Sequence, residues 1–174
     1  MKNRFLLLSI LSLSTMVVAA TPGEVKEGGL LRNGVLYDII GSYSQLFDWK
    51  GKPLIINVWA SWCGPCRAEM GSLDRLSQNY SGEKFNVIGI STDDYPEKAL
   101  DFLFKSGVQF PNFIDSKLAW ENMLGADRLP LTVLVNAEGR VLKKFYGSRE
   151  WDSAKSLQLI GNTFNIQLPQ TPTR

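Results

Sequence analysis

The stretch NVWASWCGPCRAEM, residues 57–70, holds both cysteines of the chain, Cys63 and Cys66. It overlaps the continuous apolar run PLIINVWA, residues 53–60, which is typical of a strand covered on both faces. After Cys66 the pattern changes, and apolar residues recur at every third or fourth position, as they do along one face of a helix. The cysteine pair is therefore predicted to lie where a buried strand gives way to a helix.

Three chemical roles are open to this pair. A structural disulfide is poorly placed, because bridging residues only three apart closes a very small loop, and the entropic gain grows with loop length. Zinc needs four ligands, mostly Cys and His, whereas the chain has two cysteines and no histidine; copper(I) between two thiolates stays open. Disulfide exchange fits best. A thiolate at Cys63 would face the unpaired N–H groups of the helix start, and Cys66 is spaced to resolve a mixed disulfide.

The first twenty residues differ from the rest of the chain. Lys2 and Arg4 precede an uncharged apolar run from Phe5 to Ala20. This pattern predicts a secretory signal peptide at 1–20 that is removed from the mature protein. The alternative is an uncleaved membrane anchor, for which the run is short, since a membrane span takes about 20 residues. We expect a periplasmic or otherwise exported protein, in a compartment where disulfides persist.

Composition narrows the class of protein further. Hydrophobic residues make up 44% of the 174 residues and charged residues 21%, which is typical of a soluble globular protein. The chain has 19 basic and 17 acidic residues, and two of the basic ones lie in the predicted signal peptide, so residues 21–174 are formally neutral. We therefore expect no binding to nucleic acid. The prediction is one domain at 21–174, a monomer, with a mobile C-terminal tail.

The order of predicted elements favours an α/β fold. Asn33-Gly34 between apolar residues predicts an early hairpin, and Asp93 and Asp94 are expected to cap a helix. Further predicted elements are strands at 53–60, 86–91 and 113–115, helices at 65–80, 94–106, 118–124 and 152–162, and a hairpin of strands 131–136 and 141–146. Strands and helices alternate first, and a hairpin and a helix follow. This order predicts a mixed central sheet flanked by helices on both faces.

The segment WASWCGPC resembles the active site of the thioredoxin superfamily. With the predicted signal peptide, the segments GKPLIINVWASWCGPCRAEM, VIGISTDD and LPLTVLVNAEGRV resemble the TlpA/ResA-like branch of exported thiol-disulfide oxidoreductases. That branch includes the DsbE-type reductants of cytochrome c maturation. The resemblance spans about residues 30–165 and implies a thioredoxin fold with a helix-containing insertion at about 95–125. One departure is Leu131, where DsbE-type proteins usually carry an acidic residue.

The resemblance also implies roles for individual residues. It makes Cys63 the attacking thiol and Cys66 the resolving thiol. Pro130 matches the cis-proline that lies beside the dithiol in this family. Leu129 would offer its backbone to an extended substrate segment, and Trp62 would be a contact surface beside the attacking thiol.

Three more residues lie close to the pair in the sequence. Glu69 stands at a position that is often acidic in this branch; it could transfer protons at the dithiol, or it could be a solvated helix residue. Asn57 stands where cytoplasmic thioredoxins carry a buried aspartate, and an amide cannot accept a proton as that carboxylate does. Trp59 is expected in the core.

The absence of histidine bears on the direction of electron flow. Strongly oxidising relatives have a histidine beside the nucleophile, and stabilising the reduced form makes a disulfide a stronger oxidant. We therefore expect a reductant of specific exported protein disulfides, recycled by a membrane thiol donor, with no metal and no cofactor besides the Cys63–Cys66 disulfide. The alternatives are a disulfide oxidase or isomerase, a copper chaperone, and a redox-sensing adaptor.

Overall fold

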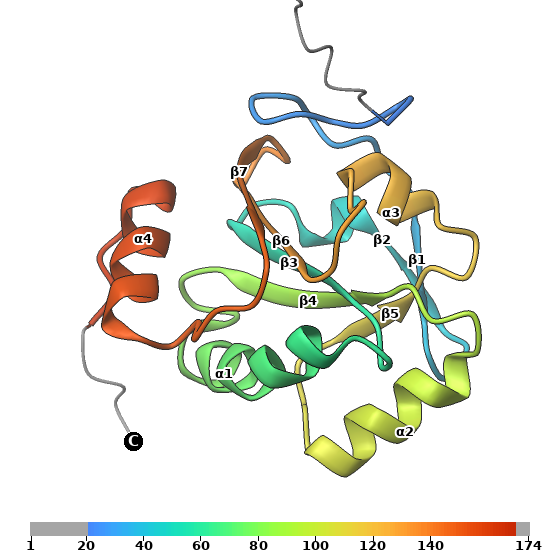
Figure 1. Cartoon of the computed structure of the whole chain (residues 1–174). Coiled ribbons are helices and arrows are strands. Elements are labelled where there is room, and N and C mark those ends of the chain that lie inside the picture. Colours follow the sequence, from blue (N-terminus) through green and yellow to red (C-terminus); the bar gives the residue numbers. More distant parts are fainter. Residues whose placement is uncertain (1–20, 170–174) are drawn as a thin grey trace, which may run out of the picture.

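The computed structural model describes residues 21–169, and a mixed β-sheet lies at its centre (Figure 1). The described part of the sheet has seven strands in the order β2-β1-β5-β4-β3-β6-β7. Their bounds are β1 Val35–Asp38, β2 Tyr43–Gln45, β3 Leu54–Trp59, β4 Asn86–Ser91, β5 Asn112–Ile114, β6 Leu131–Val135 and β7 Val141–Tyr146. β3, β4 and β5 are parallel, and the other neighbouring pairs are antiparallel. This is the α/β arrangement that the sequence predicts.

Helices cover both faces of the sheet. α1, α2 and α4 pack on one face, and α3 packs on the other with the N-terminal segment and the 3₁₀ turn η1. The bounds are η1 Leu46–Trp49, α1 Gly64–Tyr80, α2 Pro96–Ser106, α3 Ala119–Leu124 and α4 Ala154–Phe164. α2, β5 and α3 together form the helix-containing insertion that the resemblance implies.

β3 is the central strand, and all six of its residues are buried. Ile55 and Trp59 point into the core under α1, while Ile56 and Val58 point into the core under α3. Burial on both faces explains the continuous apolar run in the sequence. Asn57 is the one polar side chain of the strand, so its hydrogen-bonding groups must find partners inside the protein.

The N-terminal hairpin is present, but its turn is not at Asn33-Gly34. β1 and β2 are joined through residues 39–42, where Gly41 has a φ of +101°. Gly34 lies against Trp120 instead, and a Cβ atom at this position would be 3.0 Å from the indole ring. The predicted turn is therefore wrong, because this glycine permits close packing rather than a chain reversal.

The N-terminal segment, residues 21–32, runs across β7 and α3. The backbone N–H of Val25 donates to the carbonyl of Met123 at 2.8 Å. The ammonium of Lys144 on β7 lies 2.6 Å from Oε1 of Glu24, in an ion pair whose side chains are only 6% and 17% exposed. This segment therefore ties the β7 edge of the sheet to α3.

The predicted signal peptide and the predicted mobile tail lie at the two ends of the chain. The predicted signal peptide, 1–20, and residues 170–174 of the predicted tail lie outside the described residues. The preceding residues of that tail contact the protein: Leu168 packs against the core under α1, and the hydroxyl of Tyr80 donates to the carbonyl of Pro169 at 2.8 Å. The part of the predicted mobile tail that the structure describes is thus fastened to α1.

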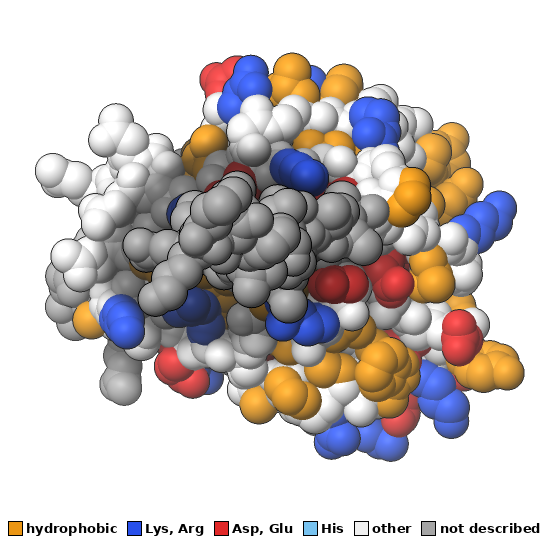
Figure 2. All heavy atoms as spheres, turned by 45° about the horizontal axis from the view of Figure 1, so that its top comes forward, with side chains coloured by type: hydrophobic (Ala, Val, Ile, Leu, Met, Phe, Trp, Pro, Cys, Tyr) orange, Lys and Arg blue, Asp and Glu red, His pale blue; other side chains and the backbone are white. Residues whose placement is uncertain are grey.

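Charged side chains of both signs are interspersed on the face seen in Figure 2, with apolar side chains between them. This pattern agrees with the formal neutrality of residues 21–174.

Candidate active site

The cysteine pair lies at the junction of β3 and α1, where the sequence places it. Cys63 is the N-cap residue of α1, and its Sγ accepts a hydrogen bond from the backbone N–H of Cys66 at 3.2 Å. The two cysteines form a disulfide with a Cα–Cα distance of 5.3 Å. Cys63 is 6% exposed and Cys66 is fully buried. An incoming thiolate or disulfide can therefore meet Cys63 first, while Cys66 stays behind it.

A tight turn presents the first cysteine. The backbone N–H of Cys63 donates to the carbonyl of Ala60 at 3.1 Å, which closes a turn with Ser61 and Trp62 at its centre. Trp62 is 71% exposed, although an indole of this size is usually buried. The turn thus displays a large apolar surface directly beside the sulfur.

A shallow groove runs past the disulfide. Trp62, Cys63 and the helix start line one side, and Ala126 and Leu129 line the other with two acidic residues, Glu121 and Asp127. The second wall is contributed by α3 and the loop after it. The insertion therefore builds half of the groove.

The Leu129–Pro130 peptide bond is cis, as the resemblance implies. Pro130 is buried and Leu129 is partly buried at the groove, immediately before β6. The structure thus places three predicted residues along one groove, Cys63, Trp62 and Leu129, and Pro130 directly follows Leu129. Their substrate-binding roles stay predictions.

Glu69 is buried on α1, one turn beyond Cys66. Its Oε2 accepts hydrogen bonds from the backbone N–H of Arg149 at 2.9 Å and from the indole N–H of Trp151 at 3.0 Å. Burial raises the pKa of Glu69, and these hydrogen bonds oppose the rise only in part. The interpretation of Glu69 as a solvated helix residue is therefore wrong. Its role in proton transfer stays a prediction.

Asn57 links this carboxylate to the sheet. Its Nδ2 donates to Oε1 of Glu69 at 2.8 Å and to the hydroxyl of Thr132 at 3.0 Å. Its Oδ1 is buried and has no hydrogen-bond partner among residues 21–169. A protonated Glu69 could donate to that oxygen after a flip of the amide, so Asn57 can accommodate both protonation states of the carboxyl group.

The prediction that Asp93 and Asp94 cap a helix is wrong for α2. The N-cap residue of α2 is Tyr95, and no side-chain hydrogen bond caps that helix. The carboxylate of Asp93 accepts hydrogen bonds from the N–H and the hydroxyl of Ser61, in the turn before Cys63. Sequence reasoning missed this contact. The available signal was that Asp93 comes shortly after a buried strand, residues 86–91, whose end can align with the end of β3.

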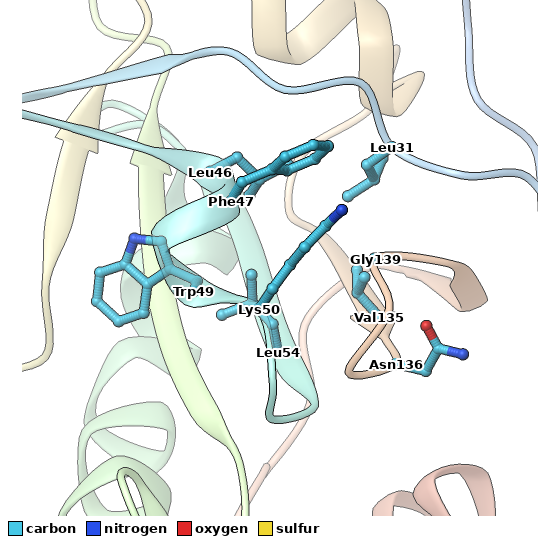
Figure 3. Close-up of a pocket in the computed structure, with 9 residues that line it drawn as sticks. All are labelled: Leu31, Leu46, Phe47, Trp49, Lys50, Leu54, Val135, Asn136 and Gly139. Atoms are coloured by element: carbon cyan, nitrogen blue, oxygen red, sulfur yellow. The ribbon is translucent and has the colours of Figure 1, made fainter.

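A second, apolar pocket lies at the opposite end of β3 (Figure 3). Leu31, Leu54 and Val135 line it, and the ammonium of Lys50 lies 3.2 Å from the centre of the Phe47 ring. No cysteine lines this pocket. It is therefore separate from the redox site.

Metal-binding clusters and membrane-spanning helices are both absent from the described part of the chain. Within 21–169, no group of three or more Cys, His, Asp or Glu residues is arranged to hold a metal ion. None of the helices in this range is long and apolar enough to cross a membrane.

A Cys-x-x-Cys disulfide between a central strand and a helix, beside a groove that is also lined by the residue before a cis-proline, defines a thioredoxin-like redox protein. A family described as Redoxin matches residues 27–159, and the chain belongs to this family. The thiol-disulfide oxidoreductase ResA of Bacillus subtilis (strain 168) is 28% identical over 131 residues, which cover 75% of this chain and 73% of ResA. ResA of Halalkalibacterium halodurans is 30% identical over 115 residues, which cover 66% of this chain and 65% of that protein.

Solved structures show the same likeness. A protein from Chlorobium tepidum, named for the thiol:disulfide interchange protein DsbE, superposes with a TM-score of 0.72 and 26% identity. The match covers 80% of this chain and 99% of that one. StoA of Bacillus subtilis, at 21% identity and a TM-score of 0.61, shares the fold; that match covers 68% of this chain and 90% of StoA. These findings confirm the thioredoxin fold and a thiol-disulfide oxidoreductase of the ResA and DsbE type.

Proposed function

We propose that the protein is an exported reductant of specific protein disulfides, in which Cys63 attacks and Cys66 resolves. The observation that carries this proposal is the charge around Cys63. Apart from the cysteine, the titratable residues that line the groove are both acidic, Glu121 and Asp127, and the chain contains no histidine. Negative neighbours disfavour a thiolate, and a less stable reduced form makes the disulfide couple more reducing.

The reduced pair would act in two exchange steps. The Cys63 thiolate attacks one sulfur of the substrate disulfide, a mixed disulfide forms, and the other substrate sulfur leaves as a thiolate. Cys66 then loses its proton and attacks the Cys63 sulfur, which releases the second substrate sulfur and closes the Cys63–Cys66 disulfide. Two electrons pass to the substrate. We propose that buried Glu69 accepts the proton from Cys66.

The substrate would be bound as an extended segment. The backbone of Leu129 before Pro130 and the exposed face of Trp62 are the proposed contacts, and no metal or further cofactor takes part. The signal-like segment at 1–20 supports a location outside the cytoplasm, periplasmic or anchored to the membrane. There a membrane thiol donor would have to return the protein to its reduced state, since such compartments are oxidising.

Cytochrome c maturation is the particular process that the resemblance to DsbE-type reductants favours. The apolar Leu131 after Pro130 departs from the acidic residue that is usual in that group. This departure concerns cytochrome c maturation only and does not affect the assignment as a thiol-disulfide oxidoreductase. A Cys66→Ser variant tests the role in cytochrome c maturation, because it should hold its substrate as a mixed disulfide. Recovery of an apocytochrome from the exported fraction would support this assignment, and recovery of other proteins alone would contradict it.

The reduction potential tests the direction of electron flow. Equilibration of the oxidised protein with a dithiol buffer should give a value near that of thioredoxin, about −270 mV, or lower. A value of about −120 to −180 mV would contradict a reductant and point to disulfide formation or isomerisation. Copper(I) titration of the reduced protein tests the chaperone alternative separately.

A further inference from the structure

Asp93 is a buried carboxylate that the exchange steps above do not use. It is 2% exposed, and its Oδ2 accepts hydrogen bonds from the backbone N–H of Ser61 at 2.8 Å and from the hydroxyl of Ser91 at 2.7 Å. Its Oδ1 accepts from the hydroxyl of Ser61 at 2.6 Å. Among residues 21–169, no Lys or Arg forms an ion pair with it. Three hydrogen bonds therefore stabilise the carboxylate of Asp93, and Ser61 donates two of them.

The sheet brings these residues together. β3 and β4 are parallel, Trp59 pairs with Ser91 at their ends, and the N–H of Thr92 donates to the carbonyl of Trp59 at 2.9 Å. Residues just beyond the two strand ends must then lie side by side at one edge of the sheet. Ser61 and Asp93 are each two residues beyond the end of their strand.

Ser61 is the first of the two central residues in the turn from Ala60 to Cys63. Both hydrogen-bond donors of Ser61, the backbone N–H and the hydroxyl, are bound to one carboxylate, which leaves this corner of the turn little freedom to rotate. Hydrogen bonds to a charged acceptor are stronger than those between neutral groups. The next residues along the chain are Trp62, in the groove, and Cys63, at the helix N-cap.

We propose that Asp93 is a positioning residue for disulfide exchange: through Ser61 it fixes the turn that sets Cys63 at the start of α1 and Trp62 in the groove. Asp93 does not itself contact the sulfur. Attack on a disulfide needs a defined approach of the thiolate, and a misplaced reacting group lowers the rate even when the fold is intact. The inference holds for either direction of electron flow, so it stands apart from the proposed reductant role.

The experiment uses four variants of the full chain in reduced form. Asp93→Asn removes the charge and one acceptor oxygen, Ser61→Ala removes one donor but keeps the charge, and Ser61→Thr keeps the hydroxyl. The matched control is Asp94→Asn, because Asp94 is the exposed neighbour of Asp93. Each protein is mixed with a peptide that carries one disulfide, and the maximal single-turnover rate is followed across pH until it reaches its plateau.

The expected result is a lower plateau in Asp93→Asn and Ser61→Ala, by about tenfold or more, since small misplacements can cost up to about 100-fold. Ser61→Thr should recover most of the rate, and Asp94→Asn should match the parent protein. The plateau is the informative quantity, because there all of Cys63 is thiolate and a mere shift in thiolate fraction would leave it unchanged.

Two outcomes would overturn the proposal. Plateau rates equal to that of the parent in both Asp93→Asn and Ser61→Ala would show that the turn needs no such fixing. A faster reaction in Asp93→Asn with no change in Ser61→Ala would show that Asp93 acts through its charge alone. If Asp93→Asn does not fold, as judged by circular dichroism, Ser61→Ala and Ser61→Thr still test the proposal. Equal plateau rates in these two variants would overturn it.

Discussion

At the scale of single residues, Glu69 is the side chain whose environment differs most from what its sequence position suggests. A carboxylate on the first turns of a helix is ordinarily solvated, yet this one lies among Asn57, Arg149 and Trp151. Arg149 and Trp151 lie about eighty positions further along the chain, and no local pattern indicates their hydrogen bonds. The acidic residue was visible in the sequence, but its burial was not, because burial depends on long-range packing.

We expect Glu69→Gln to change how stability depends on pH. Burial raises the pKa of Glu69 above its ordinary value of 4.5. An acid with a higher pKa in the folded state stabilises the fold fully below its unfolded pKa, and that contribution is lost as pH rises through the folded pKa. The free energy of unfolding of the parent protein should therefore fall relative to that of the variant as pH rises above 4.5. Denaturant titrations of both oxidised proteins measure the difference.

The variant is a fair comparison because the site can accept an amide. After a flip of the Asn57 amide, the glutamine side chain of the Glu69→Gln variant would be able to donate to Oδ1 of Asn57, which has no partner among the described residues. Burial also raises the pKa values of Asp115 and Glu121, but both groups are present in the two proteins, so their contributions cancel. Parallel curves across pH would show that the pKa of Glu69 is the same in the folded and unfolded protein, and they would contradict the prediction.

At the scale of elements, β3, α1 and the β6–β7 hairpin could be predicted from sequence because each has a clear period. β3 reads as a continuous apolar run, and its six buried residues explain why. The prediction of a turn at Asn33-Gly34 is wrong for a physical reason. Oδ1 of Asn33 accepts a hydrogen bond from the N–H of Phe47, and Gly34 makes room for Trp120. The dipeptide Asn-Gly alone does not show whether its glycine makes a hairpin turn or makes room for a distant side chain such as Trp120.

Two glycines provide a test of packing between elements. A Cβ on Gly89 of β4 would lie 1.9 Å from Oδ1 of Asn112, which accepts the indole N–H of Trp59. We expect Gly89→Ala to lower the free energy of unfolding by about 1–3 kcal/mol, the usual cost of overpacking. Thermal and denaturant unfolding measure this loss.

The matched control is Gly71→Ala on the exposed side of α1, where a Cβ would meet only an Arg75 side-chain nitrogen at 3.5 Å. Alanine is the better helix former by up to about 1 kcal/mol, so this change should stabilise the protein. Equal effects of the two substitutions would contradict the packing that we describe around Gly89.

The insertion element α3 supplies a prediction about specificity. Glu121 and Asp127 are the acidic residues of the groove wall opposite Trp62. We expect Glu121→Gln and Asp127→Asn to slow reduction of a peptide with lysine beside its disulfide, each by up to about fivefold, because an exposed ion pair contributes about 1 kcal/mol at most. A peptide with glutamate at the same position should react faster with the variants. Equal changes in the reduction rates of both peptides would show that Glu121 and Asp127 do not select substrates by charge.

At the scale of the whole molecule, the sheet separates two cores, and the redox pair belongs to the one under α1. The sequence predicted this fold class, the strand-to-helix position of the pair and the insertion. It did not reveal the contact between Asp93 and Ser61, which depends on how the ends of two parallel strands align. It also did not reveal how residues 21–32 fasten the opposite face.

That fastening can be tested with two adjacent lysines of β7. Lys144 and Glu24 form a nearly buried ion pair, whereas the side chain of Lys143, paired with Glu27, is 54% exposed. We expect Lys144→Ala to lower the free energy of unfolding by about 3 kcal/mol or more, because it leaves a carboxylate without its partner in a buried site. Lys143→Ala should cost less than about 1 kcal/mol. Similar losses would show that the Lys144 pair is open to water.

The near-complete burial of both sulfurs has a consequence for the cell. Outside the cytoplasm, a protein that carries reducing electrons is surrounded by oxidants and foreign thiols, and each accidental collision could discharge it. Cys66 is fully buried and Cys63 is only 6% exposed beside the groove, so few random collisions can bring another sulfur into contact with the pair. Under the proposed reductant role, a substrate must lie along the groove to react, so the packing that stabilises the fold would also limit wasteful oxidation of the pair.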